Sequence, residues 1–312
     1  MARAFVFPGQ GSQAIGMGRA LCDAFPAARE VFEEVDDALE RRLSRIMWDG
    51  PVETLTATEN AQPAIMAVSV AAVRVLQKET GLDVADAMFA AGHSLGEYSA
   101  LCAAGAVDLA QTARLLRVRG EAMRDASAKE DGTMAALLGV DRDGAEAIVE
   151  AALGEGALVV ANDNAPGQIV ISGARARVEF AASIAKEHGA KAAKMLDVAG
   201  AFHSPLMGPA AQAMADALEG ETVRVPIVPV VQNVTAAPTS DPETIRPGLV
   251  DQVVGSVRWT ESVEMMVNAG ATRFVELGAG KVLSGLIRRI DRDVETLQVG
   301  QPADVDAFVA AV

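Results

Sequence analysis

Aromatic residues, cysteines and nucleotide-binding loops are scarce or missing in this 312-residue chain. Aromatic residues make up 4% of it, whereas half of its residues are hydrophobic. A buried core must therefore consist mainly of Ala, Val, Leu, Ile and Met, as in an ordinary α/β protein. The two cysteines, Cys22 and Cys102, are too few and too far apart to indicate a disulfide framework or a zinc site. The glycine-rich segments 9–14 and 278–281 lack the flanking residues of dinucleotide and phosphate loops, so we expect neither a metal nor a cofactor.

Basic residues are also under-represented. The 27 Lys and Arg residues face 42 Asp and Glu residues, which gives a formal net charge of −15 and an isoelectric point near 4.7. This excess of negative charge argues against nucleic-acid binding, although it is compatible with a local basic patch. No apolar run is long enough to span a membrane, and the N-terminal segment breaks at Pro8 before a signal-peptide core could form. We therefore expect a cytoplasmic protein that binds no membrane, with a monomer as the default state.

The segment Gly92-His93-Ser94-Leu95-Gly96 joins an apolar run, 87–91, to an Ala-rich stretch. The run is typical of a buried strand and the Ala-rich stretch of a helix, and Gly-x-Ser-x-Gly between them is the nucleophile-elbow pattern. A sharply turned Ser needs neighbours without Cβ atoms, so that strand and helix can approach closely. The turn also places the hydroxyl at a helix N-terminus, where negative charge is stabilised. By itself the string is a common loop, but in this context it predicts that Ser94 is a nucleophile.

Strand-like and helix-like segments alternate along most of the chain. Residues 4–7, 228–234 and 273–277 are typical of strands, and their alternation with helices favours an α/β fold with a mainly parallel sheet covered on both faces. Between 128 and 198 the expected order is β-α-β-β-α-β, which is typical of a ferredoxin-like unit. We therefore predict a large α/β-hydrolase-like domain of residues 1–127 and 199–312, with a small ferredoxin-like α+β subdomain, 128–198, inserted in it.

A nucleophilic serine needs a base, and the chain has three histidines. His188 lies at a charged helix end, where a solvated side chain is the simplest interpretation. His93 adjoins Ser94, and adjacent side chains on a tight turn diverge, so we expect it to be structural or to line a pocket. His203 follows the last strand of the small unit, at a junction between the two units where clefts form. By elimination His203 is the favoured base.

The group that would orient this imidazole, and the role of Arg119, stay open at this point. Asp163 lies in a turn and is expected to be exposed, and nothing aims Asp197 at the ring of His203. A backbone carbonyl could serve instead. Arg119 ends a mainly apolar helical stretch, where a long cation usually extends to water. The alternative is a bidentate clamp for a substrate carboxylate, but composition favours the solvated interpretation.

These motifs resemble those of one family: the malonyl-CoA:acyl carrier protein transacylases of fatty-acid synthesis, which are related to the acyltransferase domains of polyketide synthases. The matching strings run in the same order over nearly the whole chain, and as a set they are highly specific. They are Phe7-Pro8-Gly9-Gln10-Gly11-Ser12-Gln13, Gln62-Pro63-Ala64, Gly92-His93-Ser94-Leu95-Gly96-Glu97-Tyr98, Arg119-Gly120, Asn164-Ala165-Pro166-Gly167-Gln168, Ala201-Phe202-His203-Ser204-Pro205, and Gln252 ahead of Trp259-Thr260. One departure is Gly255-Ser256, where relatives often carry a proline.

The resemblance implies a role for each catalytic position. Ser94 would take the malonyl group and His203 would act as the base. A main-chain carbonyl, expected from Gln252, would orient the imidazole. The backbone amides of Gln10 and Leu95 would form the oxyanion hole. No cofactor is implied, because malonyl-CoA is a substrate.

The resemblance also implies how the acyl group is chosen. Arg119 would pair with the free malonyl carboxylate, which reverses the interpretation from composition. Phe202 resembles the malonyl-selective pattern, in which bulk disfavours a methyl branch. Gln62 and Asn164 match positions near the pocket, and His93 is expected to line it. The expected partners are malonyl-CoA and an acyl carrier protein.

Three alternatives come from other functions. A discrete acyltransferase of a polyketide pathway would share every motif, a serine esterase or thioesterase would share the elbow, and a docking module could keep the fold without activity. Because such carrier proteins are acidic, we expect a local basic patch near the cleft mouth. Its candidate residues are Lys191, Lys194, Lys281, Arg288 and Arg289.

Overall fold

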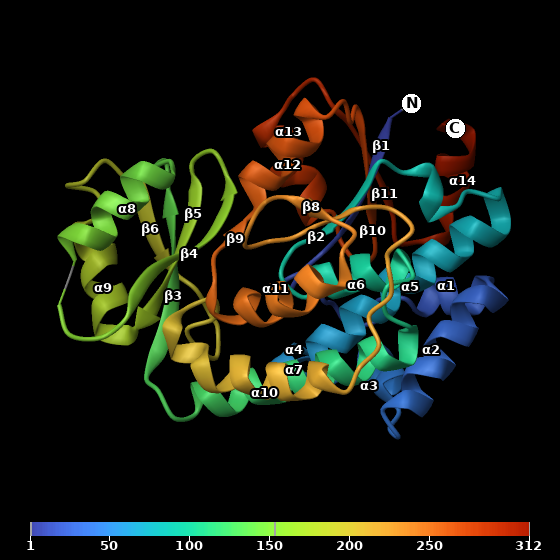
Figure 1. The fold of residues 1–312 in the computed structure, drawn as a ribbon, viewed down its shortest axis with the longest axis horizontal. Coiled ribbons are helices and arrows are strands. Elements are labelled where there is room, and N and C mark those ends of the chain that lie inside the picture. Colours follow the sequence, from blue (N-terminus) through green and yellow to red (C-terminus); the bar gives the residue numbers. More distant parts are fainter. Residues whose placement is uncertain (1, 153, 312) are drawn as a thin grey trace.

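A computed structural model describes residues 2–152 and 154–311, which form two sheets with helices around them (Figure 1). In the described part of the chain the larger sheet has six strands in the order β11-β10-β1-β2-β7-β8. Neighbouring strands are parallel except β8, which is antiparallel to β7. The strands are β1 (Arg3–Phe7), β2 (Phe89–Gly92), β7 (Val230–Val231), β8 (Pro238–Thr239), β10 (Arg273–Leu277) and β11 (Glu295–Val299). This mainly parallel sheet confirms the predicted α/β class.

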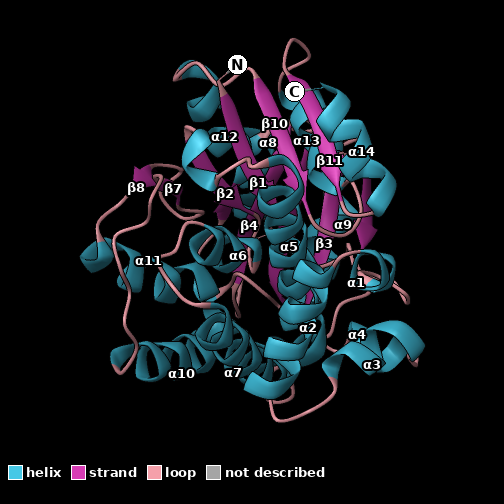
Figure 2. Cartoon of the chain, turned by 90° about the vertical axis from the view of Figure 1, so that its right-hand side faces the viewer, coloured by secondary structure: helices cyan, strands magenta, loops and turns pink. Residues whose placement is uncertain are grey.

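Helices cover both faces of the larger sheet, and the alternation of side chains along β1 shows it. Phe5 and Phe7 belong to a core cluster with α5 (Thr58–Thr80), whereas Ala4 and Val6 belong to a separate cluster with α12 and α13. Figure 2 shows β1, β10 and β11 side by side among these helices. The elements not described elsewhere are α1 (Arg19–Ala24), α2 (Pro26–Ala38), α3 (Leu43–Asp49), α4 (Val52–Thr56), η1 (Val84–Asp86), α12 (Trp259–Asn268), α13 (Val282–Ile290) and α14 (Pro302–Ala311).

The smaller sheet, at the left of Figure 1, has the order β6-β3-β5-β4-β9. Its first four members come from the predicted β-α-β-β-α-β segment, and their antiparallel order is that of a ferredoxin-like unit. The fifth strand, β9, comes from outside residues 128–198 and pairs in parallel with β4. The elements are β3 (Gly132–Leu138), α8 (Arg142–Ala151), β4 (Leu158–Ala165), β5 (Gln168–Ala174), α9 (Arg175–Ile184), β6 (Ala192–Met195) and β9 (Val257–Arg258).

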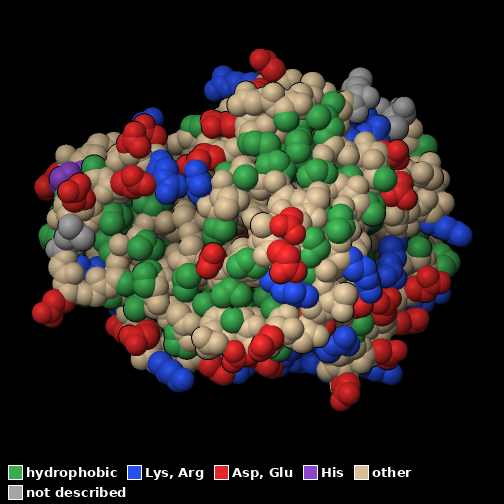
Figure 3. Space-filling view, viewed as in Figure 1, with side chains coloured by type: hydrophobic (Ala, Val, Ile, Leu, Met, Phe, Trp, Pro, Cys, Tyr) green, Lys and Arg blue, Asp and Glu red, His purple; other side chains and the backbone are tan. Residues whose placement is uncertain are grey.

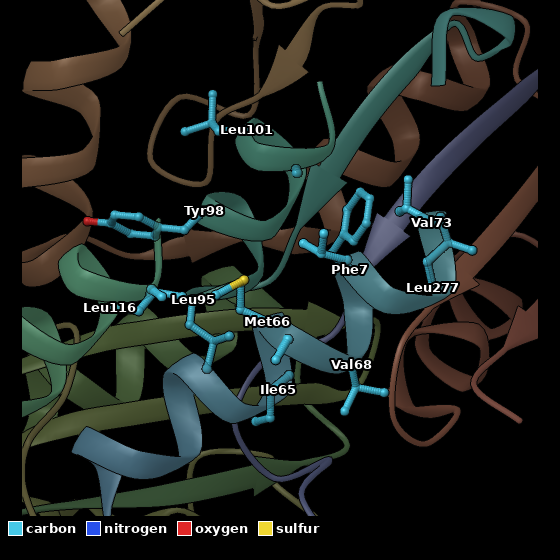
Figure 4. Packing of buried hydrophobic residues seen from close by; sticks show 14 of the residues in the cluster. Phe7, Ile65, Met66, Val68, Val73, Leu95, Tyr98, Leu101, Leu116 and Leu277 are labelled. Carbon is cyan, nitrogen blue, oxygen red and sulfur yellow. The ribbon is translucent and has the colours of Figure 1, made fainter. Parts of the chain in front are cut away.

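The main core lies between the larger sheet and the helices α5, α6 (Gly96–Ala103) and α7 (Leu109–Ser127). Figure 4 shows part of it, with Phe7 of β1 near Val73 of α5, and Leu95 near Met66. This packing fixes the end of β2 and the start of α6 beside the loop that follows β1. Among the described helices, none combines the length and the apolar character that crossing a membrane requires.

Candidate active site

The nucleophile elbow forms as predicted, and its two glycines are required sterically. Ser94 follows β2 with a φ of +52°, a conformation that non-glycine residues rarely adopt. A Cβ atom on Gly92 would lie 1.9 Å from the carbonyl carbon and oxygen of Gly96, and one on Gly96 would lie 2.2 Å from the carbonyl oxygen of Phe7. Because these obstacles are backbone atoms, no side-chain rotation could relieve them. The glycines therefore let β1, β2 and α6 meet beneath Ser94.

His203 is the histidine that reaches this serine. It precedes η2 (Pro205–Met207) and α10 (Gly208–Glu219), and its Nε2 lies 2.8 Å from Ser94 Oγ. Its Nδ1 lies 2.8 Å from the carbonyl oxygen of Gln252 and 3.2 Å from that of Gly255. Carbonyl oxygens only accept hydrogen bonds, so Nδ1 carries the proton and Nε2 accepts one from Ser94 Oγ. This geometry brings together the predicted nucleophile, base and orienting carbonyl. The contact between Gln252 and His203 forms although Gly255 stands where the family pattern often has proline.

The imidazole of His203 is neutral by virtue of its surroundings. Its side chain is buried, and burial, reinforced by the nearby Arg119 guanidinium, lowers its pKa to about 3. A neutral imidazole that accepts a hydrogen bond from a serine hydroxyl is the form a general base requires. Ser94 and His203 can therefore carry out nucleophilic acyl chemistry.

Arg119 is buried in the centre of the site, so the expectation of a solvated side chain was wrong. It is 1% exposed, because Gln62 of α5, the ring of Tyr98 on α6 and Gln252 pack around its guanidinium. Nη1 donates to Gln62 Oε1 at 2.7 Å, and Nη2 donates to Gln252 Oε1 at 3.0 Å and to Ser94 Oγ at 3.1 Å. Nε has no hydrogen-bond partner among the described residues. A buried guanidinium beside the nucleophile can bind an anionic group on the acyl chain.

A cavity of about 350 Å³ opens over Ser94, Arg119 and His203. Four further residues of the predicted site line it: Gln10, His93, Asn164 and Phe202. Gln62 and Leu95 are buried and are not among its lining residues. Gln62 instead accepts a hydrogen bond from Arg119 Nη1 outside the cavity lining, which makes it a positioning residue for Arg119.

The two amides predicted to form an oxyanion hole are free of other acceptors. Within the described segments the backbone N–H groups of Gln10 and Leu95 make no hydrogen bond. Gln10 follows β1, and Leu95 lies between Ser94 and α6, as the N-cap residue of that helix. Both amides are therefore free to donate to an oxygen that develops negative charge.

His93 connects the elbow to the smaller sheet. Its Nε2 donates to Asn164 Oδ1 on β4 at 2.7 Å, and its ring lies 5.8 Å from the ring of Trp259. Burial lowers its pKa, so this ring is also neutral. The neighbouring Asp163 is buried on β4 and accepts a hydrogen bond from Thr260 Oγ1 at 2.5 Å, so its predicted exposure in a turn was wrong. The strand continues through the segment that composition marked as a turn.

Two residues of the site were not assigned a role from the sequence. Asn233, in the segment after β7, accepts a hydrogen bond from Ser94 N and donates one to the Gly92 carbonyl, both at 2.7 Å. Glu97 Oε2 accepts from Asn233 N at 3.0 Å and from Gln252 Nε2 at 2.7 Å. Nothing in its local sequence distinguishes Asn233. For Glu97 there was a signal: a carboxylate in the first turn of a helix that is otherwise mostly apolar.

Known proteins are similar to this chain in sequence and in fold over nearly their whole lengths. A family model described as "Acyl transferase domain" matches residues 4–300. The malonyl CoA-acyl carrier protein transacylase of Bacillus subtilis is 44% identical over 98% of this chain and 96% of that protein. The crystal structure of the acyl-carrier-protein-S-malonyltransferase from Bartonella henselae superposes with a TM-score of 0.96 at 52% identity, covering 100% of this chain and 99% of that one. A solved complex of a type II PKS acyl-carrier protein with its malonyl-transacylase also matches, with a TM-score of 0.96, 38% identity and 100% of both chains covered.

Proposed function

The chain belongs to the acyl transferase domain family, and on that premise we propose that it transfers the malonyl group of malonyl-CoA to the pantetheine thiol of an acyl carrier protein, supplying fatty-acid synthesis. The observation that carries this proposal is the contact of one serine oxygen with two groups: Ser94 Oγ lies 2.8 Å from His203 Nε2 and 3.1 Å from Arg119 Nη2. A hydrolase needs the first contact only. The second places a buried cation where a short acyl chain carrying a terminal carboxylate would end.

The reaction proceeds through a covalent acyl-serine in two matched halves. Ser94 Oγ attacks the thioester carbonyl while His203 Nε2 takes its proton. The carbon–sulfur bond then breaks, and the same proton passes to the departing CoA sulfur. In the second half His203 takes the proton of the carrier-protein thiol, whose sulfur attacks the ester, and returns that proton to Ser94 Oγ.

The oxyanion of each tetrahedral intermediate would be held by the amides of Gln10 and Leu95. Their freedom from other acceptors supports this role. Leu95 N also lies at the N-terminus of α6, where the helix dipole favours negative charge. Removal of one such donor typically costs about 3–4 kcal/mol of transition-state stabilisation.

Selection of the acyl group would fall to Arg119 and Phe202. A malonyl carboxylate satisfies the buried guanidinium, whereas an acetyl group leaves it without an anionic partner in a site of low dielectric. Phe202 lines the same cavity, and its bulk would oppose a methyl branch. Asn164 of β4 and His93, which follows β2, are joined by a hydrogen bond and line the same cavity. All of these groups come from one chain, so we expect a monomer to be active without a cofactor.

The test is intact-protein mass after mixing with malonyl-CoA alone. We expect a malonyl adduct on the wild type and none on Ser94→Ala, which lacks the nucleophile. Adding carrier protein bearing its pantetheine arm should remove the adduct and load the carrier. Release of CoA and free malonate without an adduct would indicate a hydrolase instead, and neither adduct nor CoA would refute the proposal.

The carrier protein would dock on the basic residues near the cavity mouth. Arg289 of α13 donates to Gln168 at the start of β5. Lys281 directly precedes the same helix and follows Gly280, which lies beside Ser12. The side-chain stem of Lys191 lies against Gly139, close to the hairpin between β4 and β5. On the face shown in Figure 3, Lys and Arg side chains are scattered among Asp and Glu side chains. Lys194 and Arg288 complete the candidate set, and both are exposed.

Charge removal tests this docking surface. The double variant Lys281→Gln, Arg289→Gln should raise the KM for the carrier protein and leave the rate of malonyl-CoA hydrolysis unchanged, because the patch contacts the carrier and not the acyl group. Arg45→Gln, an exposed position on α3, is the matched control. An unchanged KM in the double variant would refute the docking assignment without affecting the proposed chemistry.

A further inference from the structure

A carboxylate lies directly beneath the nucleophile, and the reaction described above does not use it. Glu97 is three residues after Ser94, in the first turn of α6, and is 1% exposed. A buried carboxylate is costly unless hydrogen bonds compensate it. Here a single oxygen, Oε2, accepts from both Gln252 Nε2 and Asn233 N. The other oxygen, Oε1, accepts no hydrogen bond from any described residue.

The first of these donors, Gln252, contacts three groups of the active site. Its carbonyl oxygen orients His203, its side-chain oxygen accepts from Arg119, and its Nε2 also donates to the Ser94 carbonyl at 3.0 Å. Gln252 lies on α11 (Pro242–Val254), a helix far from α6 in the sequence. The hydrogen bond to Glu97 therefore ties α11 to the nucleophile helix at the point where the base is held.

The second donor, Asn233, holds the strained turn itself. Its side chain accepts a hydrogen bond from Ser94 N and donates one to the Gly92 carbonyl, so it bridges the two ends of the turn that leads into the nucleophile. Its own amide is held by Glu97. One carboxylate oxygen thus connects three segments: the elbow helix, the segment after β7, and α11.

We propose that Glu97 is a positioning residue for the acylation of Ser94, with Oε2 acting as the common acceptor that holds Gln252 and Asn233 in place. The inference rests on the proposed function, because malonyl transfer is the reaction whose rate it sets. The positioning role of Glu97 requires an acceptor oxygen and does not require a negative charge. Burial raises the pKa of Glu97 to about 7, so both protonation states are populated near neutral pH. A proton on Oε1 leaves both hydrogen bonds intact.

Two near-isosteric substitutions separate the acceptor from the charge. Glu97→Gln keeps a carbonyl oxygen that can occupy the Oε2 position, whereas Glu97→Met has similar length and no strong acceptor. The measurement is the rate of malonyl-Ser94 formation at saturating malonyl-CoA, together with the half-saturating concentration. We expect Glu97→Gln to stay within about threefold of wild type and Glu97→Met to fall by about 10- to 100-fold at saturation, as outer partners of site residues typically do. The half-saturating concentration should change little.

An uncharged fluorophosphonate that labels reactive serines supplies a second readout. Glu97→Met should label slowly as well, because the serine and its base are displaced together, while Arg114→Ala, at an exposed position on α7, should label at the wild-type rate. Thermal unfolding establishes that each variant is folded. If Glu97→Met does not fold, Glu97→Asp replaces it, since its shorter side chain cannot reach both donors, and the same slowing is expected.

The inference is overturned if folded Glu97→Met reacts at the wild-type rate, or if folded Glu97→Gln is as slow as Glu97→Met. The second result would mean that the charge matters and the acceptor alone does not suffice. Failure of the proposed function gives a different pattern, in which the wild type itself forms no malonyl adduct. In that case fluorophosphonate labelling still measures the effect of Glu97 on Ser94.

Discussion

Replacing Arg119 by alanine should change which acyl group the protein accepts. The guanidinium is 1% exposed and lies 3.1 Å from Ser94 Oγ, so a malonyl ester on that serine would place its carboxylate within reach of it. Two charge-assisted hydrogen bonds to that carboxylate would contribute about 1.5–3 kcal/mol each. Their loss, about 3–6 kcal/mol, corresponds to a decrease of about 10²- to 10⁴-fold in kcat/KM for malonyl-CoA.

The same substitution should have the opposite effect with acetyl-CoA. Acetyl leaves the wild-type guanidinium without a carboxylate in a buried site, and removing the cation removes that cost. We therefore expect kcat/KM for acetyl-CoA to stay level or rise, and the ratio of the two substrates to fall by at least the factor lost for malonyl-CoA. Ser94 keeps its hydrogen bond to His203, so the chemistry itself should survive.

The assay is acylation of Ser94 by each substrate, followed by CoA release and intact mass. Arg114→Ala is the matched control, since Arg114 is an exposed arginine on the same helix. Equal losses for malonyl-CoA and acetyl-CoA would refute the reasoning, because they would assign Arg119 a general role in holding the site. An unchanged rate with malonyl-CoA would refute it as well.

Two further predictions follow from the geometry of the site. The folded protein keeps His203 neutral down to about pH 3, whereas the unfolded chain protonates it below about pH 6.5. The rate of Ser94 acylation should therefore not decline at pH 6.5, and a rate that halves at that pH would contradict this. The free energy of unfolding of the wild type, measured by urea titration, should fall below pH 6.5 by roughly 1.4 kcal/mol per pH unit relative to that of His203→Gln. Gly92→Ala should destabilise the protein by at least about 3 kcal/mol, because its methyl would overlap the backbone of Gly96. Gly208→Ala, which meets open space, is the control, and equal melting temperatures would exclude the steric argument.

Features set by neighbours in the chain could be predicted from the sequence. The strand at 4–7 and the elbow glycines both formed as expected. Each depends on contacts between residues a few positions apart or on a regular alternation of apolar side chains. The ferredoxin-like strand order was also correct, because short connections restrict how such strands can pair.

Features set by distant packing could not be predicted in this way. Composition favoured a solvated Arg119, but Gln62 of α5, Tyr98 of α6 and Gln252 of α11 enclose its guanidinium. Composition favoured an exposed Asp163, but β4 continues through it and Thr260 closes over it. In both cases the exposure depends on an element that is remote in the sequence and that no local pattern describes.

The side chains that bear the chemistry can be identified along the chain: a serine on a glycine-flanked turn, three candidate histidines and an arginine on an apolar helix. How they are used depends on the way in which the folded chain brings them together. Ser94 and His203 lie 109 positions apart, and the carbonyl of Gln252 that orients the imidazole is a further 49 positions along the chain. Glu97 and Asn233, 136 positions apart, are joined beneath them. The physical reason is that hydrogen bonds across layers depend on where whole helices and strands come to rest, whereas a local pattern records only which face of each element is apolar.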